Sequence, residues 1–65
     1  MLAWLAKNNG SLHIDYYGDV TVTINGKLKE TRVTSPIDGW HPMDEPNPSS
    51  VKIAVVSAIK KAQAL

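Results

Sequence analysis

The chain has 65 residues, of which 43% are apolar and 20% charged, and its net charge is +1. A chain of this length forms one domain with a small core, and the composition is that of a folded protein rather than a disordered one. The absence of cysteine excludes disulfides, thiolate zinc sites and thiol catalysis. Stability must therefore come from core packing, with self-association as one way to add to it.

The first segment, Met1 to Asn8, is rich in helix-forming residues and has Leu2 and Leu5 on one stripe. The sequence that follows, Asn8-Asn9-Gly10, is typical of a helix C-terminus. The apolar start is too short for a signal peptide, and no apolar run is long enough to cross a membrane. We expect a short helix that docks against a sheet, and a cytoplasmic location.

Three segments with alternating apolar and polar residues come next, separated by Gly18 and Gly26. Connections this short allow only an antiparallel meander. The expected apolar positions are Leu12, Ile14 and Tyr16, then Val20, Val22 and Ile24, then Leu28 onward to about Val33.

The parity of this alternation predicts the turns, because moving a hairpin loop by one residue moves a whole strand to the other face. Three-residue loops would pair Tyr16 with Val20 and Ile24 with Leu28, and so keep the apolar residues together. A two-residue Asn-Gly turn, the more common hairpin type, would instead place Leu28 beside Thr23. We predict three-residue loops, at 17–19 and 25–27.

A long irregular loop is expected over about 35–48, because Pro36, Pro42 and Pro46 interrupt any regular element. After Pro48, either Ser49 or Ser50 is able to cap a second helix that runs to the C-terminus. Its expected core stripe consists of Val51, Ala54, Val55, Ala58, Ile59, Ala62 and Leu65.

The expected fold is therefore α+β: a single domain over residues 1–65 with the order α-β-β-β-α. Both helices lie on one face of the three-stranded antiparallel meander, and the other face is polar. Its expected residues are His13, Asp15, Thr21, Thr23, Lys27, Lys29 and Thr31.

The loop from Asp38 to Pro46 is the first candidate site, because a loop this long is unusual in so small a domain. Trp40, His41 and Met43 are residue types favoured in interfaces or adaptable contact surfaces. The alternative is that Trp40 folds back as a lid over the core. A metal site is not expected, since the nearby potential ligands form a short, proline-broken group: His41, Asp44 and Glu45.

The far side of the second helix is the second candidate. Ile53 and Val56 fall outside its core stripe, as Trp4 falls outside the stripe of the first helix. A solvated face does not need branched apolar residues, so this face predicts a dimer or partner surface. The alternative is that the long loop or the first helix covers it.

Catalysis has little support in the sequence, which contains no nucleophile elbow, phosphate-binding loop or helix-borne metal motif. His13 and Asp15 would share a strand face, a pairing able to orient a general base but common in proteins. Basic residues near the sheet, such as Lys29 and Arg32, are interleaved with acidic ones such as Glu30. This mixture is not typical of a nucleic-acid footprint.

The element order resembles that of two families. It is similar to that of double-stranded-RNA-binding domains, which implies nucleic-acid binding; those domains carry a lysine cluster at the start of their second helix, where this chain has Lys52 alone. Small HicA-type mRNA interferase toxins share the order and have an active histidine after a Gly-Ser pair. The sequence Gly10-Ser11-Leu12-His13 resembles that arrangement, which would make His13 catalytic.

The leading hypothesis is a small non-enzymatic protein-interaction module, an inhibitor or accessory subunit that binds a larger partner or a second copy of itself. No cofactor, metal or membrane is expected to take part, and a viral or mobile-element source would suit so compact a chain. The expected contact residues are Trp40, His41, Met43, Asp44, Glu45, Ile53 and Val56. The alternatives are a ribonuclease using His13 and a nucleic-acid-binding domain using Lys27, Lys29, Arg32, Lys52, Lys60 and Lys61.

Overall fold

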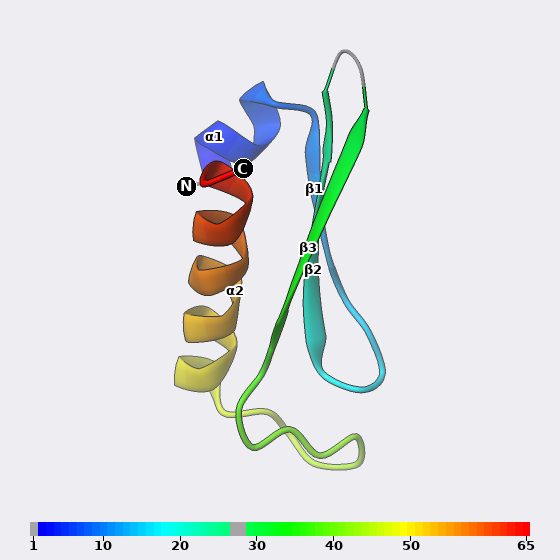
Figure 1. The fold of residues 1–65 in the computed structure, drawn as a ribbon. Helices are drawn as coiled ribbons and strands as arrows, with labels where there is room; N and C mark the ends of the chain where they lie inside the picture. The colour runs from blue at the N-terminus through cyan, green and yellow to red at the C-terminus, as the bar shows by residue number, and fades with distance from the viewer. Residues whose placement is uncertain (1, 27–28) are drawn as a thin grey trace.

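The computed structural model describes residues 2–26 and 29–65. It confirms the α+β fold class and the element order (Figure 1). The chain forms a helix, three antiparallel strands in the sheet order β1-β2-β3, and a final helix. The bounds are α1 Leu2–Lys7, β1 Gly10–Ile14, β2 Asp19–Asn25, β3 Glu30–Pro36 and α2 Pro48–Gln63.

The two helices lie on the same face of the sheet, α2 along the strands and α1 beside the C-terminal end of α2 (Figure 1). The core lies between α2 and the sheet, where Val20 and Val22 of the central strand are fully buried. The core also contains Leu5 of α1 and Ile37, the residue after β3. The residues that α2 contributes to it are Ala54, Ala58, Ile59 and Ala62. Within the described residues, no helix is long and apolar enough to cross a membrane.

The first hairpin has the predicted three-residue loop, but one residue earlier than predicted. Ile14 lies opposite Val20, and the loop is closed by a hydrogen bond from the Asp15 N–H to the Asp19 carbonyl at 3.1 Å. The Asp15 carboxylate also accepts from the Tyr17 and Asp19 N–H groups. Gly18, with a φ of 80°, takes the left-handed position that ends such a loop. The local chemistry of aspartate and glycine thus decides the turn.

Moving the loop by one residue changes the pairing of the two strands by two residues, and an even change leaves each strand residue on its predicted face. Tyr16 is the exception: it was expected in the core and opposite Val20, but it falls in the loop and is 64% exposed. Asp15, expected on the polar face of the sheet, is likewise part of the turn. His13 and Thr21 do lie opposite each other on the polar face.

The second hairpin differs from the prediction in its register and in its loop, because Asn25, predicted in a loop at 25–27, belongs to β2 and pairs with Glu30. Ile24 lies opposite Thr31, and Val22 opposite Val33, whereas the parity argument placed Ile24 opposite Leu28. Val22 is fully buried beneath α2, so an apolar partner there contributes more than one near the hairpin tip. The position of Leu28 itself lies outside the described residues, as does that of Lys27.

The observed register also changes the inner face of β3. Thr31 shares the face of Ile24 and was therefore predicted on the wrong side of the sheet. The same holds for Lys29, which lines a hollow with Ile24 and Thr31. Ser35 turns inward as well and is only 4% exposed. Its hydroxyl donates to the Ser57 hydroxyl of α2 at 3.1 Å, so this buried polar group is satisfied.

The start of α2 is capped by Asn47 and not by a serine as predicted. The Asn47 side chain accepts from the Ser49 N–H at 2.9 Å, and Pro48 takes the first helical position, where a missing N–H costs nothing. At the other end, Leu65 lies beyond the helix and is 77% exposed, so it is not the core residue that the stripe predicted. The other predicted stripe residues are buried or packed against the core.

Candidate functional site

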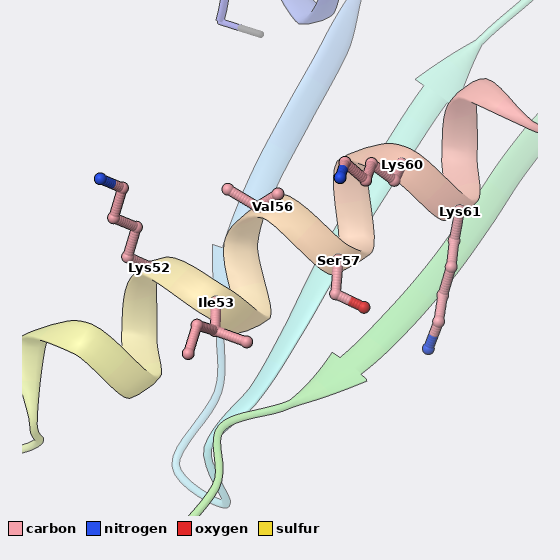
Figure 2. Close-up of a pocket in the computed structure, with 6 residues that line it drawn as sticks. All are labelled: Lys52, Ile53, Val56, Ser57, Lys60 and Lys61. Atoms are coloured by element: carbon pink, nitrogen blue, oxygen red, sulfur yellow. The ribbon is translucent and has the colours of Figure 1, made fainter.

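A mainly apolar groove runs along the solvent-facing side of α2. It is a shallow, open depression of about 460 Å³, and Figure 2 shows its side chains along the helix. We call it the outer groove; its residues are Lys52, Ile53, Val56, Ser57, Lys60 and Lys61.

Helical geometry explains why these residues lie together. They form two neighbouring rows in which residues are four apart, the first through Val56 and the second through Ser57. At about 100° per residue, Ile53, Val56 and Lys60 lie on the side of α2 away from Ala58 and Ala54. Ser57 and Lys61 lie on the flank toward β3, where they bond to Ser35 and to the Thr34 carbonyl. In the middle of the groove, Ile53 is 69% exposed and Val56 partly exposed. The two residues predicted to lie off the core stripe are therefore neighbours on one open surface.

The outer groove is positively charged. Three lysines line it, and α2 contains no acidic residue. Lys61 donates to the Thr34 carbonyl at 3.4 Å, while the one ion pair among the described residues, Arg32 with Glu30, lies on the sheet. No ion pair within the described chain therefore neutralises the groove.

The loop that leads to α2 forms a second, separate surface at one end of the molecule. Its Trp40 is half-buried and packs against the core. The indole N–H donates to the Tyr16 carbonyl at 2.9 Å, and the ring lies directly against Gly18, where a Cβ would overlap it. Trp40 thus holds the loop against the first hairpin. This agrees with the alternative prediction that Trp40 folds back over the core.

Beyond Trp40 the loop is exposed. A hydrogen bond from the Asp44 N–H to the His41 carbonyl, 3.1 Å long, closes a tight turn, and Met43 is 89% exposed. We call this segment the loop tip; it consists of His41, Met43, Asp44 and Glu45. None of these residues lines the outer groove, so the structure divides the predicted contact residues into two groups.

Two exposed aromatic residues beside Trp40 were not among the predicted contact residues. Tyr16 and Tyr17 are 64% and 77% exposed, and their rings form an edge-to-face pair with centroids 5.6 Å apart. The sequence signal that identifies them is the turn itself, since an aspartate followed three residues later by glycine predicts a loop at this point.

Charge is unevenly distributed along the elongated molecule, whose extents are 39 × 18 × 16 Å. The end formed by the first hairpin turn and the long loop (Figure 1) is acidic; it carries Asp15, Asp19, Asp38, Asp44 and Glu45. The C-terminal end of α2 carries Lys60 and Lys61, and the end of α1 beside it carries Lys7.

The arrangement around His13 offers little for catalysis. His13 is exposed on the outer face of the sheet, and the Asp15 carboxylate is already engaged by two backbone N–H groups of the turn. Across the described part of the chain, no group of three metal-ligating side chains comes together. The basic residues are also divided, with Arg32 on the outer face of the sheet and Lys52 on the opposite side of the molecule.

Comparisons with known proteins give no family for the chain. No protein-family model matches it, and neither do curated proteins or solved structures. The outer groove and the loop tip are therefore the features of the chain that indicate a function.

Proposed function

We propose that the protein is a small non-enzymatic interaction module that acts by binding a larger protein partner, as an inhibitor or accessory subunit. The observation that carries the proposal is Ile53, 69% exposed on the helix face opposite the core. A β-branched residue is a poorer helix former than alanine and gains little from an exposed position. Contact with a partner would explain why an isoleucine occupies this exposed position, which packing within the chain does not explain.

The loop tip provides a second contact in this proposal. Met43 is 89% exposed, and an unbranched thioether adapts to varied apolar surfaces. His41, Asp44 and Glu45 surround it with polar groups, as in the rim of an interface. Trp40 acts as a positioning residue, because its hydrogen bond to Tyr16 holds the loop against the hairpin.

We propose that the interaction takes place in the cytoplasm. The chain has no cysteine, so its stability does not depend on disulfides that a reducing compartment would break. No cofactor or metal is needed. A second copy of the chain is a weaker candidate than a different protein, because the lysines of two outer grooves would repel each other.

Site-specific photo-cross-linking in the source cells tests the proposal. A photoreactive side chain at position 53 is expected to give discrete cross-linked products of higher mass. The matched control is position 23, where Thr23 lies on the outer face of the sheet. Equal cross-linking at both positions, or none at position 53, would contradict a partner surface on α2.

Two alternatives have direct tests. Nucleic-acid binding would appear as affinity for a labelled duplex that falls steeply with salt, and we expect no binding at low ionic strength. Ribonuclease activity would require His13, so a cleavage rate lowered in the purified His13→Ala variant would revive that alternative.

A further inference from the structure

The outer groove restricts the kind of partner segment that fits it. We propose that it binds an amphipathic α-helix of the partner, with an apolar stripe flanked at both ends by aspartate or glutamate. This inference rests on the proposed function and names the recognised segment.

The shape of the groove fits a helix. Its walls are two rows with a four-residue spacing, Lys52-Val56-Lys60 and Ile53-Ser57-Lys61. Rows of this kind form the ridges and grooves by which helices pack, at crossing angles near −50° or +20°. From position 52 to position 60 the groove is about 12 Å long, given a rise of about 1.5 Å per residue. It therefore accommodates about two turns of a partner helix.

The charges lie at the two ends of the apolar centre. Lys52 lies at one end and Lys60 and Lys61 at the other, with Ile53 and Val56 between them (Figure 2). The helix dipole favours cations only in the last turn, so it explains Lys60 and Lys61 but not Lys52. Carboxylates about two turns apart on a partner helix would match both ends, with apolar residues filling the centre.

Other occupants fit less well. A second copy, docking through the same face, would bring three lysines against three lysines. A membrane requires a broad apolar helix face, whereas the wider apolar face of α2 is already buried against the sheet. A nucleic-acid duplex would satisfy the lysines but place Ile53 against phosphates.

Titration of the isotopically labelled protein with designed peptides tests the inference by NMR. The probe is an alanine-based helical peptide of about 16 residues with a leucine stripe and glutamates at both ends of the stripe. In the matched control peptide, each glutamate is replaced by lysine. We expect the glutamate peptide to shift amide signals of the outer groove and to bind at least about tenfold more tightly at low salt.

Charge reversal provides the decisive variant. The double variant Lys52→Glu/Lys60→Glu changes exposed side chains only, so it is expected to fold and to reverse the preference to the lysine peptide. The double variant Lys7→Glu/Lys29→Glu changes the net charge by the same amount at two exposed lysines outside the groove, so it controls for overall charge and is expected to leave the preference unchanged. A dispersed spectrum verifies that each variant is folded.

Several results would overturn the inference. These are equal affinity for the two peptides, shifts located away from α2, or groove signals that respond to anionic phospholipid vesicles or an RNA duplex and not to the glutamate peptide. If the peptide titration fails but position 53 gives specific cross-links, the proposed interaction module stands and only the proposed acidic helix is rejected. Failure of both experiments would remove both proposals.

Discussion

The two faces of α2 differ in side-chain size as well as in burial, and its alanines at the core lie toward the sheet. The face toward the sheet buries three alanines and one isoleucine, Ile59, while the solvent face carries another isoleucine, Ile53. Small residues let the helix lie close to the valines of β2, where many atoms come into contact. The larger residue on the outside takes no part in that packing, which makes the two isoleucines a natural matched pair.

The largest expected effect is that of Ile59→Ala. Ile59 is 1% exposed, and such a truncation removes buried methyl groups and leaves a cavity, at a cost of about 3 kcal/mol. For so small a domain this is a large part of the free energy of unfolding. Urea denaturation followed by circular dichroism measures it. A loss below about 1 kcal/mol would show that the inner face is loosely packed.

The next effect is that of Ala58→Leu, which tests whether the inner face needs small residues. Ala58 is fully buried, so the added atoms would push α2 away from the sheet at a cost of about 2 kcal/mol. The matched control is Ala64→Leu at the exposed C-cap, with an expected change within about 0.5 kcal/mol. Similar costs in the two variants, compared by denaturant titration, would contradict the close approach of helix and sheet.

A smaller effect is expected from Asn47→Ala, which acts on α2 as a whole and on neither face. Loss of the bond from the Ser49 N–H to the Asn47 side chain should cost about 1 kcal/mol. Ser49→Ala serves as the control, since the Ser49 backbone donor remains and its side chain is exposed. Thermal unfolding of both variants decides which residue is the cap, and a loss in Ser49→Ala with none in Asn47→Ala would return that role to the serine.

The smallest effect is that of Ile53→Ala, the outer counterpart of the first substitution. Because alanine is the better helix former and Ile53 is mostly exposed, stability should stay the same or rise by about 0.4 kcal/mol. The same denaturation assay gives a direct comparison with Ile59→Ala. A cost above about 1 kcal/mol would show that Ile53 belongs to the fold, and the proposed interaction surface would lose its main support.

The sequence predicted the element order and the separation of the two faces of α2, because both follow from local periodicity. It located Ile53 and Val56 outside the core, and the structure joins them in one groove with the lysines. That these lysines share the groove follows from their four-residue spacing and was not predicted. The role of Asn47 as the cap also depends on local chemistry, and a serine was preferred to it.

The register of the second hairpin was not predictable by the same reasoning. Parity was chosen to bury Leu28, but the pairing is decided in the middle of the sheet, where Val22 meets Val33 beneath α2. Such a preference depends on where the helix crosses the strands, which is tertiary information. The inward turn of Ser35 likewise becomes favourable only because Ser57 lies within 3.1 Å.

The separation of charge along the molecule has a kinetic consequence. With acidic residues such as Asp44 and Glu45 at one end and Lys60 and Lys61 at the other, the protein has a long-range field despite its small net charge. An acidic helix would approach the C-terminal end of α2 first and then align along the groove. Lys60 and Lys61 would therefore govern the association rate and its salt dependence, while Ile53 would govern how long the complex lasts.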